Sequence, residues 1–205
     1  IITLNVIKRG NKSNGFDIWL SGYFNDIIDF SAEVNYFNIL MSDRIIWVPL
    51  SGTIWKPKNI KDVSSKGLES IIELGLFDKK INFSAAYTLT ETKNVTPNDV
   101  NYGHVLPFVP KHSLKTGLIF SHLSFSGGAN FRFSSSCFGS ESNELLSKIK
   151  YHHLTDAFLQ YAVTVSGIES TLRLEINNIY DSEYIVLPYY PTPLRNYKLS
   201  FLLKY

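Results

Sequence analysis

The chain has 205 residues, of which 44% are hydrophobic, 14% aromatic and 19% charged, and its net charge is +2. This composition permits extensive burial and excludes intrinsic disorder. The near-neutral charge and the lack of any run of five or more basic residues argue against a nucleic-acid partner. The single cysteine, Cys137, excludes an internal disulfide framework, and the sequence has no 18-residue apolar stretch that would predict a transmembrane helix.

Apolar and polar residues alternate with a period of two along the whole chain, which predicts β-strands that are covered on one face. Residues 81–90 are an example: Ile81, Phe83 and Tyr87 share one face, and Asn82 and Ser84 share the other. The first residues, IITLNVIKRG, already read as a strand and lack the features of a signal peptide. The pattern predicts about nine strands, at residues 1–9, 15–26, 61–77, 80–92, 112–121, 123–135, 151–165, 167–180 and 194–205.

The connections between these strands alternate in length. Short ones are predicted at GNKSN, at Asp78-Lys79, around His122 and around Ser166. Long loops are predicted at residues 27–60, 93–111, 136–150 and 181–193. In an up-and-down meander every second connection lies at the same end, so we expect tight turns at one rim of the sheet and large loops at the other. Function is expected at the rim with the large loops.

Strand length and charge favour a membrane-spanning sheet. Most segments reach the 9–11 residues that a tilted strand needs to cross hydrocarbon, whereas soluble strands average about 5–6.

In the last six strands, thirty positions on one face hold no charged residue. The interleaved positions hold Lys115, Arg132, Asp156, Glu169, Arg173, Glu175, Lys198 and Lys204. A charge on a lipid-facing surface costs about 2–4 kcal/mol near the bilayer midplane, so the pattern predicts an all-β, antiparallel, up-and-down transmembrane barrel with a polar interior. Because bacterial barrels have even strand numbers, nine strands also suggest a missing N-terminal portion.

The C-terminal segment EINNIYDSEYIVLPYYPTPLRNYKLSFLLKY resembles the ending of TonB-dependent outer-membrane receptors. In that family an Asn-Asn-aromatic-Asp-x-x-Tyr segment leads through a loop to Pro-x-Pro-Gly-Arg-Asn-aromatic, and the last strand ends on an aromatic residue. Leu194 stands where the family has glycine, and leucine resists the positive φ that glycine allows. The matching positions are Asn177, Asn178, Tyr180, Asp181, Tyr184, Pro191, Pro193, Arg195, Asn196, Tyr197 and Tyr205.

Two further stretches are similar to segments of the same family. IIWVPLSGTIWKPKNIKDVSSKGLE places an aromatic residue, a proline and Asn59 ahead of a Lys-Gly-aliphatic-Glu strand at residues 66–69. GHVLPFVPKHSLKTGLIF contains a Pro-x-x-Pro-x-His entry to a strand, formed by Pro107, Pro110 and His112. Together with the C-terminal segment, the resemblance covers most of residues 15–205.

The resemblance implies that residues 1–205 are the C-terminal portion of a barrel that has 22 strands when intact, here without its N-terminal plug. It implies residence in the outer membrane of a Gram-negative bacterium and import of a siderophore, cobalamin, metal chelate or glycan, driven by the TonB complex through the plug. The implied partners are outer-membrane lipid, a small-molecule ligand and, through the aromatic-ended last strand, the outer-membrane assembly machinery. A non-transport surface receptor or adhesin-like barrel is the alternative, and a soluble β-sandwich binding module comes third.

Catalytic and metal chemistry find little support. The candidate groups are His104, His112, His122, His152, His153 and Asp156. Adjacent His152 and His153 point to opposite faces of a strand, and His152 and Asp156 lie two strand steps apart. No four metal ligands occur at a sensible spacing. We therefore expect no enzyme, no cofactor and no metal site, and an unreactive thiol at Cys137.

Aromatic residues in the long loops are the candidate ligand contacts, because their rings can stack on a sugar or a flat chelate. These are Trp47, Trp55, Tyr102, Tyr189 and Tyr190. For Arg195 we expect a pairing role within the barrel wall rather than a ligand contact. Gly127-Gly128 lies inside a strand, which predicts close packing or a bend and not a phosphate-binding loop.

Overall fold

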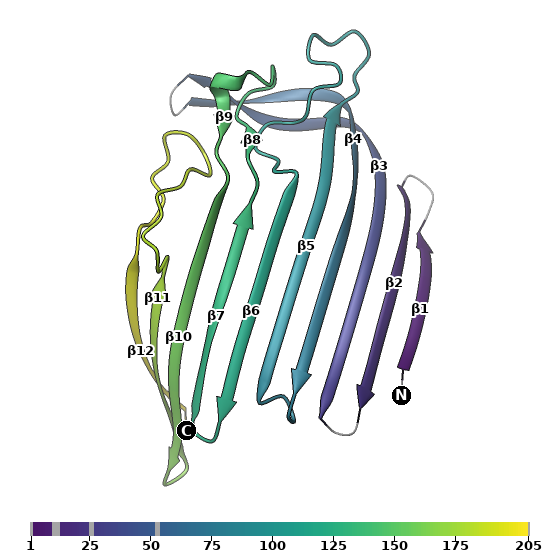
Figure 1. Cartoon of the computed structure of the whole chain (residues 1–205). Helices are drawn as coiled ribbons and strands as arrows, with labels where there is room; N and C mark the ends of the chain where they lie inside the picture. The colour runs from purple at the N-terminus through teal and green to yellow at the C-terminus, as the bar shows by residue number, and fades with distance from the viewer. Residues whose placement is uncertain (1, 10–12, 25–26, 52–53, 205) are drawn as a thin grey trace.

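A computed structural model describes residues 2–9, 13–24, 27–51 and 54–204, and most of them are β-strand (Figure 1). One antiparallel sheet contains ten strands, in which each strand pairs with the next one along the chain. Its strands are β1 (Ile2–Arg9), β2 (Ser13–Phe24), β3 (Ile28–Ser51), β4 (Ile54–Leu76), β5 (Ile81–Asn94), β6 (His112–His122), β7 (Phe125–Ser134), β10 (His152–Val165), β11 (Ile168–Asn177) and β12 (Asn196–Lys204). A separate small hairpin pairs β8 (Cys137–Phe138) with β9 (Lys148–Ile149). In the described residues the only helix is the 3₁₀ turn η1 (Leu145–Ser147), so no helix there could cross a membrane.

The two rims of the sheet differ as predicted. At one rim, which we call the turn rim, residues 77–80, 123–124 and 166–167 join successive strands in tight turns. Ser166 and Gly167 both have positive φ, as the two central residues of a type I′ hairpin turn require. At the opposite rim, the loop rim, residues 95–111, 135–151 and 178–195 connect the strands (Figure 1).

The prediction of a long loop at residues 27–60 is wrong. Residues 28–51 form β3, which pairs with both β2 and β4, so the sheet has ten strands and not nine. Only Asn25, Asp26 and Ile27 separate β2 from β3, and the predicted strand 15–26 included the two residues, Asn25 and Asp26, that favour a turn. The extra strand also moves the β1–β2 connection to the loop rim, because Arg9 pairs with Gly15 there, whereas GNKSN was predicted among the turns of the opposite rim.

The register places the uncharged positions on one face of the sheet, which we call the apolar face. One row of directly paired residues on this face runs Gly22, Phe30, Leu74, Phe83, Leu118, Ala129, Ala157, Ile176, Tyr197. The next row, on the opposite or polar face, runs Ser21, Ser31, Glu73, Ser84, Gly117, Asn130, Asp156. The apolar residues of successive strands thus lie on the same face across almost the whole width of the sheet.

The apolar face has the height of a bilayer core. On β4 the first charged residue of this face, counted from Leu76 at the turn rim, is Lys66, which forms an ion pair with Glu91 of β5 at 3.4 Å. At a rise of about 3.3 Å per residue and a tilt near 40°, this stretch measures about 25 Å along the membrane normal. That is the height of the outward apolar band of outer-membrane barrels.

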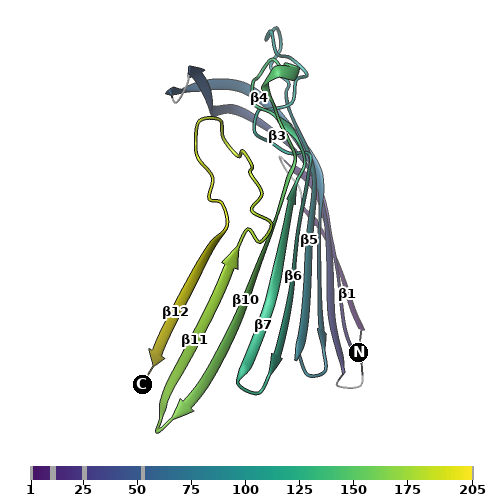
Figure 2. The ribbon, with the colours of Figure 1, turned by 60° about the vertical axis from the view of Figure 1, so that its left-hand side comes forward.

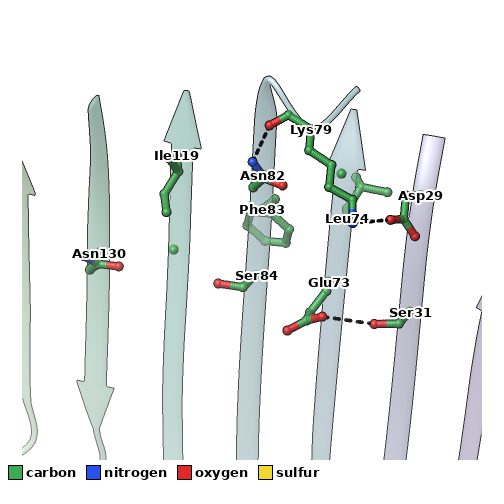
Figure 3. A pocket seen from close by; sticks show the side chains of 12 residues that line it. Asp29, Ser31, Glu73, Leu74, Lys79, Asn82, Phe83, Ser84, Ile119 and Asn130 are labelled. Atoms are coloured by element: carbon green, nitrogen blue, oxygen red, sulfur yellow. Dashed lines mark hydrogen bonds and ion pairs between the residues drawn. The ribbon is translucent and has the colours of Figure 1, made fainter. Parts of the chain in front are cut away.

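The polar face is hollowed near the turn rim. A recess of 320 Å³ lies there. Figure 3 shows the hydroxyl, amide and carboxylate side chains that line it from neighbouring strands. Gly117 leaves this space open, since a Cβ there would come within 2.9 Å of Ser84 Oγ. Lys79 in the turn binds Asp29 at 2.9 Å, and the bond to this carboxylate raises the pKa of Lys79. The recess thus combines polar groups of the polar face with apolar side chains such as Leu74, Phe83 and Ile119.

A stack of side chains crosses the polar face from β7 to β12. A Cβ on Gly128 would lie 2.8 Å from the Phe158 ring and 2.6 Å from the Leu118 carbonyl, so glycine permits the ring to pack against β7. The Arg173 guanidinium lies 3.8 Å from the centre of that ring and binds Glu175 at 2.7 Å, and Glu175 also binds Lys198 at 3.2 Å. Gly127 and Gly128 thus lie inside β7, and the close packing that the sequence predicts for this pair occurs at Gly128.

The loop between β11 and β12 is closed at its base by side chains that bind backbone. Asn178 is 4% exposed and has a φ of 53°. Its side chain donates to the Ser182 carbonyl and accepts from the Ser182 N–H, both at 2.9 Å, while its own N–H donates to Asp156 Oδ1 at 2.9 Å. Asp181 Oδ1 accepts from the Arg195 N–H at 2.8 Å. The two ends of the loop are therefore fixed to the strands that carry them.

Ile71 and Ile72 provide a matched test of the two faces. They are 44% and 49% exposed, and they pair with Glu33 and Ala32, respectively, so they point to the polar and the apolar face. We expect Ile72→Arg to lower the free energy of unfolding in phospholipid vesicles by about 2–4 kcal/mol, and Ile71→Arg by less than about 1 kcal/mol. Urea titration of the reconstituted protein measures both. Equal losses would contradict a lipid-facing apolar side.

Asn178 provides a test of the loop base. Asn178→Ala removes two hydrogen bonds, leaves two partly buried backbone groups of Ser182 without these partners and places alanine at positive φ, so we expect a loss of about 2–4 kcal/mol in unfolding free energy. Asn98→Ala is the control, because Asn98 also has a positive φ, of 61°, but is exposed. The same urea titration should give a loss below about 1 kcal/mol for the control. If the two variants were equally stable, the hydrogen bonds of the Asn178 side chain would not stabilise the fold.

Candidate ligand site at the loop rim

The strands β3 and β4 continue far beyond their neighbours and form a two-stranded ribbon, which we call the arm (residues 40–51 and 54–61). Pairing of β3 with β2 ends at Ile39, and pairing of β4 with β5 ends at Val63, while β3 and β4 remain paired as far as Ser51 and Ile54. Asp43 has a φ of 55° and the ladder skips it, but the register is the same on both sides of it; the register shifts farther out, between Pro49 and Ser51. In Figure 2 the arm bends to the side of the sheet on which β11 and β12 lie.

The arm rests on a small core at the loop rim. Val63 and Leu106 are buried there and pack with Met41 and Val109. The buried Asn94 binds the Thr96 N–H through its side chain and the His104 carbonyl through its backbone N–H. This core joins β4, β5 and the loop of residues 95–111 into one unit.

Further contacts join that loop to residues 135–151. Asn143 binds both the N–H and the carbonyl of Val105, each at 2.9 Å. The Phe108 N–H donates to the Phe138 carbonyl at 2.8 Å. From the arm, the Trp55 ring packs on Phe108 with ring centres 5.3 Å apart. The arm and both loops are thus linked by side chains that lie far apart in the sequence.

A groove of 1020 Å³ lies at this rim between three segments of the chain. The arm supplies one residue of its wall, and the loops 135–151 and 178–195 supply the rest. This volume is at the upper end of the range for small-molecule sites. The groove is lined by Leu50, Gly139, residues 146–151, residues 183–185, residues 188–192 and Leu194.

Aromatic rings and unpaired charges give the groove its chemistry. Tyr151, Tyr184, Tyr189 and Tyr190 present ring faces and hydroxyl groups. Lys148 and Lys150 also line it, and no ion pair to either is found among the described residues. The one acidic side chain is Glu183. The lining suits a ring-bearing ligand that is neutral or anionic, because stacking supplies area and the lysines supply charge.

The predicted ligand contacts divide between the groove and other places. Tyr189 and Tyr190 line it. Trp55 is engaged with Phe108, Trp47 lies exposed on the arm opposite Pro57, and Tyr102 lies exposed in the loop 95–111; none of the three is part of the groove lining. Sequence reasoning missed the two lysines and Tyr151. No local motif marks them, and only their position in the fold brings them to the groove.

The family-motif residues mostly build the loop base and do not contact the groove. Asn177 pairs with Asn196 through their side chains at 2.9 Å, and Arg195 lies 3.7 Å from Asp181. Tyr184, Pro191 and their neighbours line the groove, while Tyr180, Pro193 and Tyr197 are exposed. Tyr205 lies outside the described residues. Leu194 does not have a positive φ, so the loop adopts a turn that leucine tolerates.

The histidines have structural contacts. Tyr87 Oη lies 2.7 Å from His112 Nδ1, and His104 Nδ1 lies 3.1 Å from the Glu141 carbonyl. The other three contact rings: His122 stacks on Phe120, His152 packs on Tyr184 and His153 stacks on Phe131.

The remaining candidate groups form no reactive site. Asp156 binds Arg132 at 2.6 Å and the Asn178 N–H, so it is not available to a histidine. Burial raises the pKa of the Cys137 thiol, which keeps it protonated. Within the described residues no group of three or more histidines, cysteines or acids could hold a metal ion.

Comparison with known proteins agrees with this architecture. Residues 7–179 match the family model of the TonB dependent receptor-like β-barrel. The ferric citrate transporter FecA in its unliganded form superposes with a TM-score of 0.71 at 17% identity, over 94% of this chain and 31% of that one. BauA, the ferric preacinetobactin receptor from Acinetobacter baumannii, gives 0.68 at 16% identity, over 92% and 29% of the two chains.

A third structure, the siderophore receptor PiuA from Acinetobacter baumannii, gives a TM-score of 0.64 at 21% identity, over 92% of this chain and 28% of that one. A comparison of the sequence with curated proteins gave no match. The chain spans less than a third of the length of these three structures. The matched family consists of receptors and not enzymes, which supports the prediction that this chain has no catalytic site. With 173 consecutive residues matched, the chain belongs to the TonB-dependent receptors, whose transmembrane β-barrel it forms in part.

Proposed function

We propose that this chain is the C-terminal portion of an outer-membrane receptor that imports a scarce nutrient. The observation that carries the proposal is the pairing register, which gives the sheet one uncharged face about as tall as a bilayer core and one polar face. A sheet of this kind forms part of a barrel wall, with lipid outside and a hydrated passage inside. The large loops would then lie on the extracellular side.

The groove is the proposed point of ligand entry. Its tyrosines and lysines favour a siderophore, another metal chelate or cobalamin, and a glycan could stack on the same rings. FecA, BauA and PiuA are named for ferric citrate, ferric preacinetobactin and a siderophore, which agrees with this range of ligands. Because the described residues offer no metal-binding cluster, metal would arrive already chelated.

The remaining steps require parts of the protein beyond this chain. Passage would be gated by an N-terminal plug and driven by the TonB complex acting on it. The last strand, with its alternating apolar residues, would be read by the outer-membrane assembly machinery in a Gram-negative bacterium. A groove with unpaired lysines favours small-molecule capture over an adhesin-like role, for which a broad flat surface would suffice.

The two adjacent tyrosines test the assignment of the groove. Cells with and without the intact receptor are supplied with radiolabelled ferric citrate, a ferric catecholate, cyanocobalamin and a malto-oligosaccharide, and the compound whose uptake depends on the receptor is kept as the probe. Changing both Tyr189 and Tyr190 to Ala should weaken probe binding by about tenfold or more, through the loss of stacking area.

Tyr102→Ala is the matched control, since Tyr102 is an exposed loop tyrosine outside the groove lining. It should leave binding within about twofold of the unmodified receptor. Full binding by the Tyr189/Tyr190 variant would overturn the groove assignment. If none of the four compounds depended on the receptor, the proposed import of these ligand classes would be wrong.

A further inference from the structure

The charges of the polar face are divided by sign. Below the arm, the described charged residues on the polar face of β2, β3 and β4 are all acids. On β5 this face carries no charged residue. From β6 to β12 it carries lysine and arginine, which outnumber the acids. The acids of β2–β4 are Asp17, Asp29, Glu33, Glu69 and Glu73, and the cations of β6–β12 are Lys115, Arg132, Arg173, Lys198 and Lys204.

Two of these cations, which we call the cation pair, lie directly opposite each other. Lys115 of β6 is the pairing partner of Arg132 of β7, and both positions belong to the polar face. Like charges in directly paired positions destabilise a sheet. Asp156 compensates Arg132 at 2.6 Å, whereas no hydrogen bond or ion pair to the exposed Lys115 side chain is found among the described residues. The two cations thus share one carboxylate.

The acids of the other half of the sheet do not compensate Lys115. Glu33 lies in the same row of paired residues but three strands away, which is about 14 Å. Glu73 lies two strands away and accepts a hydrogen bond from Ser31 Oγ of β3 at 3.4 Å (Figure 3). Asp156 uses both of its carboxylate oxygens for other partners. Within the described part of the wall, Lys115 therefore has no counter-ion.

A recess of 620 Å³ on the polar face provides room for a small molecule at the cation pair. Its cations are Lys115 and Arg132, and its acids are Asp156 and Glu73. Small residues of β5 and β6 also line it, so the space beside Lys115 is not filled by a long side chain. The remaining lining includes amide and hydroxyl groups that can donate hydrogen bonds to an anion, namely those of Asn130, Asn177 and Ser84.

The recess lies next to the groove, toward the turn rim. Leu154 pairs with Arg132 and follows Tyr151 of the groove lining by three residues, which is about 10 Å along a strand. Lys148 and Lys150 of the groove are also without an ion pair among the described residues. An anion that leaves the groove toward the turn rim therefore meets the cation pair within about 10 Å.

We propose that the cation pair and its recess form a binding site for a small anion that carries a carboxylate or phosphate group. The Lys115 ammonium and the free N–H groups of the Arg132 guanidinium donate charge-assisted hydrogen bonds to the oxygens of this anion. The anion supplies the counter-ion that Lys115 lacks and offsets the repulsion between the two cations. The proposal rests on the proposed function in one respect, namely that the polar face borders a hydrated passage.

Iron-free, radiolabelled citrate is the probe, and its binding to the purified intact receptor is measured by equilibrium dialysis at low ionic strength. The starting receptor carries Lys148→Met and Lys150→Met, so that the groove lysines do not contribute. It should bind citrate saturably, and unlabelled inorganic phosphate should displace the citrate. Adding Lys115→Met should weaken citrate binding by about tenfold or more, because it removes a charge-assisted hydrogen bond.

Two further variants separate the site from a general effect of charge. Lys204→Met is the matched control, because it removes a lysine of the same face that is already paired with Glu169 at 3.5 Å, and citrate binding should stay within about twofold. Lys115→Arg keeps the charge and should retain binding within about threefold. Equal losses in Lys115→Met and Lys204→Met would overturn the site, as would the absence of saturable citrate binding to the starting receptor.

Thermal unfolding distinguishes a binding role of Lys115 from a structural one. Without citrate, Lys115→Met removes one of two directly opposed like charges, so its unfolding midpoint should equal or exceed that of the starting receptor. Citrate should raise the midpoint of the starting receptor and not that of Lys115→Met. A lower midpoint for Lys115→Met without citrate would contradict the proposal, because another part of the intact protein would then already supply the counter-ion.

The anion site and the proposed import fail separately. If uptake of none of the four test compounds depended on the receptor while citrate binding depended on Lys115, the anion site would stand and import of those ligand classes would be wrong. If receptor-dependent uptake were found and Lys115→Met bound citrate as tightly as the starting receptor, import would stand and the anion site would be wrong.

Discussion

Hydrogen bonding of the backbone is the constraint on which the rest of this structure depends. Within hydrocarbon every N–H and carbonyl needs a partner inside the protein, and a continuous antiparallel ladder satisfies this requirement for the strands between β1 and β12. The ladder in turn makes each side chain face one of two sides, since side chains alternate along a strand. A one-residue slip between any two strands would exchange lipid-facing and lumen-facing residues, so the uncharged rows and the ladder stabilise the same register.

Charged and buried polar residues appear where the sheet extends beyond the apolar band. Lys66, Glu91 and Lys93 occupy the apolar side at this level and pair with one another, which lipid hydrocarbon would penalise but an interface tolerates. Here too are the buried polar residues Asn94, whose side chain accepts from the Thr96 N–H, and Thr96, whose hydroxyl binds the backbone of Asp62 in β4. Structure at the loop rim is thus held by specific side-chain contacts in place of the repeating ladder. Such contacts can differ between receptors without disturbing the barrel wall.

This difference explains what the sequence predicts and what it does not. Alternation such as that of Ile81, Phe83 and Tyr87 depends only on neighbouring residues, so the wall and its two faces follow from the sequence. The motif around Asn178 and Asp181 identifies the last loop for the same reason, because its hydrogen bonds are local. By contrast, only Asn25 and Asp26 mark the turn before β3, and the strand's charged residue Glu33 and late proline, Pro49, resemble loop composition. The groove is less predictable still, because Leu50, Lys148 and Tyr189 meet only after the arm has bent across the rim.

The two walls of the groove are held by interactions of different character. The loop 178–195 is fixed by amide and carboxylate side chains that bind backbone, at Asn178 and Asp181, and every such bond would have to break together for the loop to leave. Among the described side chains, the arm is held by the Lys58–Glu141 ion pair, the Trp55–Phe108 ring contact and the packing of Met41 on Val63 and Leu106. Because an ion pair near water contributes only a small net free energy, the position of the arm depends more on its own ladder and on the apolar packing of Met41 and Trp55. One wall of the groove is thus fixed by side chains that bind backbone at the base of a single loop, whereas the position of the other depends on side chains from separate segments that meet only in the folded chain.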